Sequence, residues 1–160
     1  DLGFTDFDDI PELVLDDPYT AARWTARAGN TETLVAGESV QFDRPSSGGD
    51  SRGGHSYLND EADGCLVADL IAGTTYEVSF TFESDDSNAY AEIVHDGYYA
   101  ATVGNGLKTI HFTYVSGSPY LQFEYLSNSK YVKLSGLTVK SVNGNPLTLV
   151  NDPTWSTDSP

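Results

Sequence analysis

The stretch that decides the fold is Gly73-Thr74-Thr75-Tyr76-Glu77-Val78-Ser79-Phe80-Thr81-Phe82. From Tyr76 to Phe82, large apolar side chains occupy every second position. This alternation predicts a half-buried antiparallel strand that turns one face to the core and the other to water. A glycine turn opens the stretch and an acidic, serine-rich segment follows it, so we expect the strand to end on both sides.

Similar short segments recur along the chain, and no convincing helical period covers any part of it. Glycine and serine turns separate most of them. The pattern predicts strands over residues 24–28, 39–43, 65–70, 75–83, 89–94, 107–115, 120–126, 131–134 and 137–142. Strands at this spacing are typical of an all-β, antiparallel β-sandwich, and a jelly roll fits best.

Alternation also predicts which side chains fill the core between the two sheets. We expect one continuous core built from Tyr76, Val78, Phe80, Phe82, Ile110, Phe112, Tyr114, Leu121, Phe123 and Tyr125. Cys65 is the only cysteine. A single thiol excludes a disulfide framework and a cysteine-rich zinc site, so we expect Cys65 to be a small buried core residue.

The 160 residues suffice for one domain with a real core. Residues 1–22 mix acids with single apolar side chains and predict an extended N-terminal arm that docks on this domain or on a neighbour. Residues 23–142 form the predicted sandwich, and residues 143–160 the C-terminal tail. Glycine and serine make residues 45–54 a flexible loop by composition.

The charge of the chain excludes several classes of partner. Acidic side chains number 24 against 8 basic ones, for a formal net charge of -16. Such a surface repels nucleic acid and gains nothing from anionic lipid. No apolar run approaches the length of a membrane-spanning helix. We therefore expect neither nucleic acid nor a membrane as a partner.

Four segments carry a resemblance to a known family: Arg23–Gly29, Ala72–Phe80, Pro119–Phe123 and Val132–Val139. Together they resemble the strands of jelly-roll carbohydrate-binding modules, including the copies found in tailed-phage virion proteins and in secreted glycan-active enzymes. The likeness covers about residues 23–142. Each motif is mainly a packing pattern, so the resemblance implies a fold more strongly than a function.

The same family often binds a structural calcium through an aspartate in the final strand and an acidic residue near the N-terminus. In this chain Ser135-Gly136 occupies the place of that aspartate. Asp6, Asp8 and Asp9 offer oxygen ligands, but a hard cation needs several at once. We therefore expect no metal and no cofactor.

A carbohydrate site needs exposed aromatic rings to stack on sugar C–H faces and polar side chains to orient the hydroxyls. The candidate residues are Tyr90, His95, Asp96, Tyr98 and Tyr99. His95-Asp96-Gly97-Tyr98-Tyr99 is expected at a turn, where at least one of the adjacent tyrosines is exposed. The alternative to a sugar platform is a tyrosine that packs on the edge of the sheet and leaves its hydroxyl exposed to solvent.

Nothing in the sequence indicates catalysis. His55, His95 and His111 are widely separated, and no nucleophile motif flanks any of them. Trp24 is expected in the core, because it matches the opening strand of the family. We therefore expect a protein that is not an enzyme.

Two functional hypotheses remain. The first is a virion structural protein, a capsid decoration or fibre component that contacts neighbouring copies or other virion proteins and adheres to surface glycans. Its subunit contacts are expected at Phe4, Phe7, Ile10, Tyr19 and Trp155. The alternative is a carbohydrate-binding module of a secreted polysaccharide-active enzyme or adhesin. These hypotheses place the protein on a virion surface or outside the cell, the first as an oligomer within an assembly.

Overall fold

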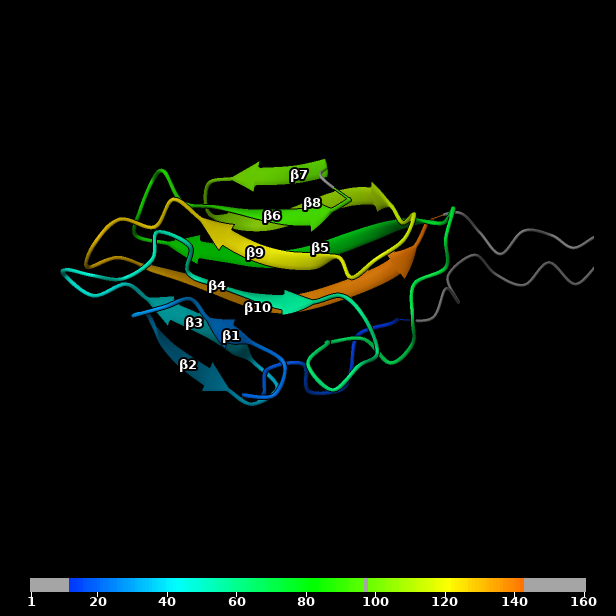
Figure 1. The fold of residues 1–160 in the computed structure, drawn as a ribbon, viewed down its shortest axis with the longest axis horizontal. Coiled ribbons are helices and arrows are strands. Elements are labelled where there is room, and N and C mark those ends of the chain that lie inside the picture. The colour runs from blue at the N-terminus through cyan, green and yellow to red at the C-terminus, as the bar shows by residue number, and fades with distance from the viewer. Residues whose placement is uncertain (1–11, 97, 143–160) are drawn as a thin grey trace, which may run out of the picture.

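The structure is a computed structural model that describes residues 12–96 and 98–142. These residues form ten strands and no helix (Figure 1). The strands are β1 (Thr25–Ala26), β2 (Thr31–Val35), β3 (Ser39–Asp43), β4 (Gly54–Tyr57), β5 (Thr75–Ser84), β6 (Tyr90–His95), β7 (Tyr98–Val103), β8 (Gly106–Thr113), β9 (Tyr120–Glu124) and β10 (Tyr131–Ser141). No described residue lies in a helix of the length and apolarity that a membrane crossing requires.

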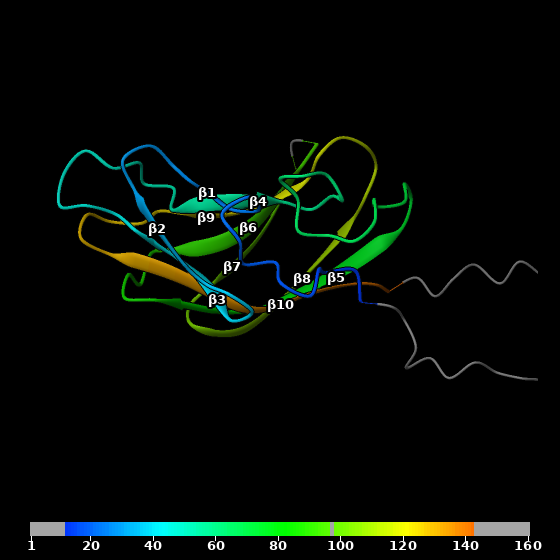
Figure 2. The same ribbon diagram turned by 90° about the horizontal axis from the view of Figure 1, so that it is seen from below.

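Within the described ranges the strands pair into two five-stranded antiparallel sheets. The first, here called the β9 sheet, has the order β1-β4-β9-β6-β7, and the second, the β10 sheet, has the order β2-β3-β10-β5-β8. In Figure 2 strands β4 and β9 lie on one side of the sandwich, and β3 and β10 lie on the other. The predicted all-β antiparallel sandwich with a jelly-roll fold is confirmed.

Strand β5 forms as its alternation predicts. Tyr76, Val78, Phe80 and Phe82 are all buried, and the residues between them lie on the wetter face. The strand pairs with β10 on one side and with β8 on the other, so it sits inside the β10 sheet. Both edges of β5 are thus paired within its own sheet, and its apolar face is buried by packing against the β9 sheet.

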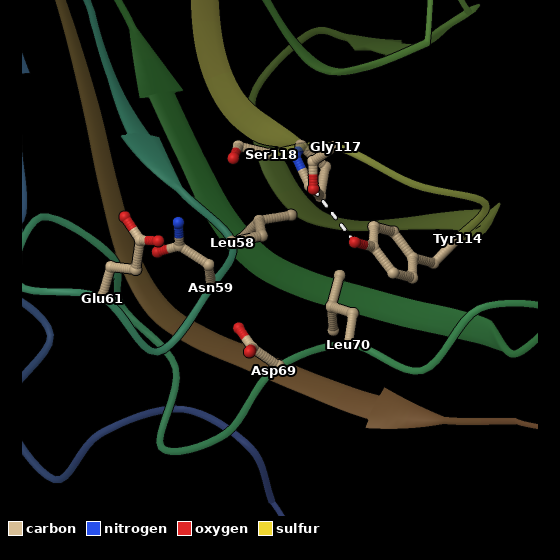
Figure 3. A pocket seen from close by; sticks show the side chains of 9 residues that line it. Leu58, Asn59, Glu61, Asp69, Leu70, Tyr114, Gly117 and Ser118 are labelled. Atoms are coloured by element: carbon tan, nitrogen blue, oxygen red, sulfur yellow. Dashed lines mark hydrogen bonds between the residues drawn. The ribbon is translucent and has the colours of Figure 1, made fainter.

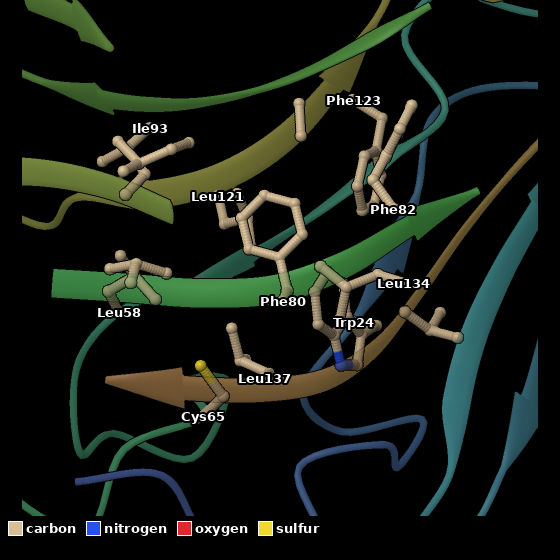
Figure 4. Close-up of a cluster of buried hydrophobic side chains, with 14 of the residues drawn as sticks. Trp24, Leu58, Cys65, Phe80, Phe82, Ile93, Leu121, Phe123, Leu134 and Leu137 are labelled. Atoms are coloured by element: carbon tan, nitrogen blue, oxygen red, sulfur yellow. The ribbon is translucent and has the colours of Figure 1, made fainter. Parts of the chain in front are cut away.

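The two sheets enclose one continuous apolar core (Figure 4). Trp24, Phe42 and Phe123 form an aromatic cluster within it, with ring centroids 5.7 to 6.2 Å apart. Trp24 is 2% exposed, and its Nε1 donates a hydrogen bond to the Pro18 carbonyl at 2.8 Å. The prediction that Trp24 belongs to the core is confirmed. Cys65 is also buried and unpaired, as expected, and burial raises the pKa of its thiol to about 11.

Several predicted strands need correction. Residues 65–70 form no strand, because Leu66 makes only an isolated bridge with Val14 and the segment bends away after it. The two strands predicted over 131–142 are one strand, β10, whose register shifts between Ser135 and Thr138. Gly136, with a φ of 60°, lies at that irregularity. Strands β2, β4 and β7 were not predicted at all.

The core prediction fails at one residue. Tyr125 was expected to point inward, but it is 62% exposed. Its φ is 57°, so the backbone leaves the extended conformation directly after β9 and the alternation stops there. Phe112 and Tyr114 are only half-buried and pack against the edge of the core.

Residues 12–22 of the predicted arm pack on this same domain. The Leu13 amide donates to the Val139 carbonyl at 3.0 Å, and the Leu15 amide donates to the Cys65 carbonyl at 3.1 Å. Tyr19 is buried, and its hydroxyl accepts a hydrogen bond from the Leu137 amide at 2.9 Å. The expectation that Tyr19 contacts a neighbouring subunit is therefore corrected, because its side chain is used inside this chain.

The other expected subunit contacts are Phe4, Phe7, Ile10 and Trp155, and they lie outside the described residues.

Within the loop over residues 45–54, backbone carbonyls accept hydrogen bonds from polar side chains. The side-chain Nδ2 of Asn30 lies within hydrogen-bond distance, 2.6 to 3.1 Å, of the carbonyls of Asp50, Arg52 and Gly53 and donates to them. The loop is thus fixed to Asn30, the residue directly before β2, which begins at Thr31.

Candidate functional site

The outer face of the β9 sheet, which turns away from the core, holds a dense group of polar and aromatic side chains. On β9 the residues Leu121 and Phe123 point inward and are buried in the core. The alternate positions of the three central strands therefore point outward. We call this surface the β9 face, and it comprises His55, Tyr57, Tyr90, Glu92, Val94, Tyr120, Gln122 and Glu124.

Strand register arranges the β9 face in three rows across the sheet. Directly opposed residues on neighbouring strands bring their Cβ atoms to within about 5 Å, so each row is a line of side-chain contacts. The first row is Tyr57, Tyr120 and Val94, the second is His55, Gln122 and Glu92, and the third is Glu124 and Tyr90. The first row is thus mainly aromatic, the second is mainly polar, and the third sets a carboxylate beside a tyrosine.

The middle of the face is a hydrogen-bonded polar network centred on Gln122. Its Nε2 donates to Glu92 Oε1 at 2.6 Å and to Glu124 Oε1 at 2.9 Å. Its Oε1 accepts a hydrogen bond from Arg27 Nη2 at 3.2 Å. Gln122 and Glu92 are only 4% and 5% exposed, although both lie on the outer face. The network is therefore held in one geometry, and Glu124 and Arg27, which are half-buried, carry it toward solvent.

One side of this network is an aromatic cluster. The rings of His55, Tyr57 and Tyr120 meet edge to face, with centroids 5.4 to 5.9 Å apart. Such T-shaped contacts stabilise a fixed arrangement of rings. Tyr57 and Tyr120 are half-buried, so part of each ring lies at the surface.

The other side of the network carries a second pair of rings. Tyr90 and Tyr125 lie with their ring centroids 5.5 Å apart and their planes at 34°. Burial raises the pKa of the Tyr90 hydroxyl, and the charges of Glu92 and Glu124 add to the effect. Burial also raises the pKa of Glu124, and the nearby Glu92 carboxylate adds to it. The third row therefore combines the Glu124 carboxylate with Tyr90, and Tyr125 packs beside it.

An ion pair lies beside this edge. Arg52 Nη2 donates to Asp50 Oδ2 at 2.7 Å, and Arg52 Nε donates to Asp50 Oδ1 at 3.1 Å. These hydrogen bonds lower the pKa of Asp50 to about 2. Both side chains are exposed enough for the pair to contribute little to stability. The pair instead fixes charges close to Glu124.

The five sugar-site residues expected from the sequence fall into different places. Tyr90 lies on the β9 face. His95 is not part of any exposed site, because it is 7% exposed and its Nε2 accepts a hydrogen bond from the Val115 amide at 2.9 Å. Its ring stacks on Tyr114 at 5.3 Å. Asp96 has a φ of 46° at the turn after β6 and accepts a hydrogen bond from the Ser116 hydroxyl at 3.1 Å.

Tyr98 and Tyr99 are part of β7 rather than of the turn itself. In the ladder with β6, Tyr98 stands opposite His95 and Tyr99 opposite Val94. Their side chains lie outside the described part of the structure. Sequence reasoning missed the other residues of the β9 face, among them Tyr57, Glu92, Tyr120, Gln122 and Glu124. It also missed Arg27, which donates a hydrogen bond to Gln122. For β9 a signal was present in the sequence, because Tyr120, Gln122 and Glu124 alternate with the predicted core residues Leu121 and Phe123.

A separate hollow lies at the end of the sandwich, between the loop over residues 58–70 and the loop over 114–119 (Figure 3). Its volume is about 220 Å³, and its polar lining includes Asn59, Glu61, Asp69 and Ser118. Tyr114 closes one side by donating a hydrogen bond from its hydroxyl to the Gly117 carbonyl at 3.0 Å. Among residues 12–96 and 98–142, no three His, Cys, Asp or Glu side chains gather closely enough to hold a metal ion.

His55 gives the β9 face a testable dependence on pH. Burial lowers the pKa of its imidazole below the ordinary value of about 6.5, and the charge of Arg27 lowers it further. The unfolded chain therefore binds this proton at a higher pH than the folded one. As the pH falls below about 6.5, this group favours unfolding, and above that value it has no effect.

We expect the replacement His55→Phe to remove this dependence while it keeps an aromatic ring against Tyr57 and Tyr120. The measurement is urea unfolding of both proteins from about pH 8 to about pH 5. The free energy of unfolding of the unchanged protein should fall relative to that of the variant as the pH decreases. An unchanged difference across this range would show that His55 does not titrate in this way.

Comparison with known proteins bears on the fold. No protein-family model matches the chain, and no curated protein matches it. Among solved structures, the CBM22-1 xylan-binding domain of Paenibacillus barcinonensis Xyn10C superposes with a TM-score of 0.50 at 15% identity, over 86% of this chain and 97% of that one. The tandem CBM22-1-CBM22-2 structure of the same protein gives 0.49 at 14% identity, over 89% of this chain and 47% of the other.

A third similar structure is a family 29 carbohydrate-binding module, CBM29-2, in complex with cellulohexaose. It gives a TM-score of 0.48 at 9% identity, over 82% of this chain and 89% of that one. The chain spans about half of the tandem structure. The match to the single xylan-binding domain shows that the two proteins share a β-sandwich fold, and at this identity it shows no more.

Proposed function

We propose that this protein is a non-catalytic carbohydrate-binding module that binds a neutral glycan chain on the β9 face. One observation carries the proposal. The polar network of Gln122, Glu92, Glu124 and Arg27 lies between two groups of tyrosine rings on the outer side of a sheet. A small-molecule site typically has a small number of polar groups, held in fixed geometry among aromatic side chains.

The network costs stability where it lies. An outer sheet face can be covered with exposed threonine or lysine at no desolvation cost, yet here Glu92 and Gln122 are almost fully buried. Burying a carboxylate beside a second carboxylate is unfavourable, and the amide of Gln122 offsets only part of that cost. Because the fold does not need this buried network for its stability, the presence of the network supports a binding role.

The chemistry of the face suits a sugar. A sugar ring has apolar C–H faces and a rim of hydroxyl groups, so it needs both an aromatic surface and fixed acceptors and donors. Tyr57 and Tyr120 supply the aromatic surface. Glu124 accepts hydrogen bonds from hydroxyls, and Arg27 donates to ring or hydroxyl oxygens.

Charge selects among glycans. The face carries the carboxylates of Glu92 and Glu124, and the whole chain has a formal net charge of -16. Glycans with uronate or sulfate groups are therefore repelled, both at a distance and at the site. Neutral polysaccharides meet no such barrier.

This proposal develops the alternative of the two hypotheses, a module of a secreted polysaccharide-active enzyme or adhesin. The comparisons support it through the fold, since the matched single-domain structure is described as a xylan-binding domain. They give no support to the virion role. We accordingly propose an extracellular location and a glycan as the partner.

The proposal is tested with a panel of immobilised polysaccharides. We expect binding to neutral chains such as xylan, mixed-linkage glucan or mannan, and none to polygalacturonate or heparin. Tyr120→Ala should weaken binding about tenfold, which corresponds to ~1.4 kcal/mol of lost ring contact. Tyr131→Ala is the matched control, because Tyr131 lies on the β10 sheet and bonds Glu83.

Affinities are measured by isothermal titration calorimetry on correctly folded protein, checked by thermal unfolding. Binding to no neutral glycan, or to charged glycans alone, would contradict the proposal. So would equal losses of affinity in Tyr120→Ala and Tyr131→Ala.

A further inference from the structure

We propose that Tyr125, together with Tyr90, forms a second aromatic subsite that lengthens the glycan footprint along β9. This inference rests on the proposed function and adds to it Tyr125, a residue that the sequence pattern had assigned to the core. Its ligand is a linear neutral oligosaccharide longer than a disaccharide. The subsite lies on the opposite side of the polar network from Tyr57 and Tyr120.

The backbone at Tyr125 is the first observation. Its φ of 57° lies in the left-handed region, which glycine and asparagine occupy easily and a bulky aromatic residue does not. Holding a tyrosine there costs of the order of 1 kcal/mol. A turn that served only to end the strand would be more stable with glycine at this position.

The neighbours of Tyr125 are anchored on both sides. Glu124 is the last residue of the β9 ladder. Leu126 is fully buried, and its amide donates to the Ser51 carbonyl at 2.7 Å. The Ser127 amide donates to Asp86 Oδ2 at 2.7 Å. These contacts hold the left-handed conformation in place, and Tyr125 as a residue is 62% exposed.

The place of the ring is the second observation. Tyr125 packs against Tyr90, which stands opposite Glu124 in the ladder between β6 and β9. Tyr120, in the first aromatic cluster, lies four residues before Glu124 on the same strand. At the rise of an antiparallel strand this separation is roughly 13 Å. A single sugar ring cannot touch both clusters, whereas a chain that lies along β9 contacts both and crosses the polar network between them.

The geometry therefore assigns different roles to the two tyrosine groups. A short chain seated on the cluster with Tyr120 reaches the near part of the network but not Tyr125. The pair of Tyr90 and Tyr125 contacts only the sugars of a longer chain. Affinity should then rise with chain length, and the rise should depend on Tyr125.

The experiment measures calorimetric affinity for xylo- and cello-oligosaccharides from the disaccharide to the hexasaccharide. We expect the unchanged protein to bind longer chains more tightly. Tyr125→Gly should lose about tenfold in affinity for the hexasaccharide and leave the affinity for the disaccharide unchanged. Glycine accepts the positive φ, so this variant should unfold at the same temperature as the unchanged protein or at a higher one.

Two further variants sharpen the result. Tyr125→Phe keeps the ring and should keep the dependence on length, and Tyr131→Ala on the other sheet should leave every affinity unchanged. Equal affinities of Tyr125→Gly and the unchanged protein for all lengths would overturn the second subsite and leave the glycan site intact. If the unchanged protein binds none of these chains and no other neutral glycan of the panel, the proposed function itself fails.

Discussion

Replacement of Trp24 by alanine is expected to lower the free energy of unfolding by about 4 kcal/mol. Trp24 is 2% exposed and packs between Phe42 and Phe123, so its removal leaves a large cavity at the contact between the sheets. The replacement also leaves the Pro18 carbonyl without its hydrogen bond from Nε1. Domains of this size are stable by about 5 to 15 kcal/mol, so the loss is a large share of the total.

The measurement is chemical unfolding followed by circular dichroism. Trp24→Phe is the matched control, because it keeps a ring against Phe123 and loses only part of the volume and the hydrogen bond. It should cost less than half as much as Trp24→Ala. A loss below about 1 kcal/mol in Trp24→Ala, the typical effect of an average substitution, would show that Trp24 does not fill the core as described.

Replacement of Gly54 by alanine is expected to destabilise the fold by about 3 kcal/mol, although it adds one methyl group. The added Cβ would lie 2.3 Å from Phe42 Cε1 and 2.4 Å from Phe42 Cζ. Phe42 is fully buried against Trp24 and Phe123, so its ring cannot turn aside without disturbing both. Glycine at this position lets β4 lie close to the core.

A double-mutant cycle with Phe42→Leu separates this clash from other effects. The smaller side chain at position 42 leaves room for the new methyl group, so Gly54→Ala should cost much less in the Phe42→Leu background. The free energies of unfolding of the four proteins give the coupling directly. A cost that is the same in both backgrounds would place the effect of Gly54→Ala elsewhere.

Much of the fold follows from alternation in the sequence. Tyr76, Val78, Phe80 and Phe82 are buried as predicted, since a strand in the middle of a sheet keeps its period of two over its whole length. Strand β4 could not be predicted in this way. Its residues Gly54-His55-Ser56-Tyr57 combine a glycine forced by close packing with two ring side chains that point outward.

The β9 face shows a different limit of sequence-based prediction. The sequence marks Leu121 and Phe123 as inward residues, and this implies that Gln122 and Glu124 point outward. It does not show which strands are neighbours, because β4, β9 and β6 pair across long stretches of chain. Only that pairing brings His55 and Tyr57 beside Tyr120, and Glu92 beside Gln122.

Tyr125 shows a third limit. Alternation extended one step too far predicted an inward ring, whereas a positive φ after Glu124 turns the ring outward. The cost of that conformation is visible only in the backbone. The turn at Asp96 led to a similar error. His95, which precedes this turn, was predicted to lie in an exposed sugar site, but its side chain is buried and packs inside the fold.

A neutral glycan is proposed to bind on the β9 face. The most direct measurement is a nuclear magnetic resonance titration of the isotope-labelled protein with xylo- and cello-hexasaccharides. We predict shifted amide signals concentrated in β4, β6 and β9, with the largest changes around Tyr120, Gln122 and Glu124. Shifts confined to the hollow lined by Asn59 and Asp69, or no shifts with any neutral glycan of the panel, would contradict binding on the β9 face.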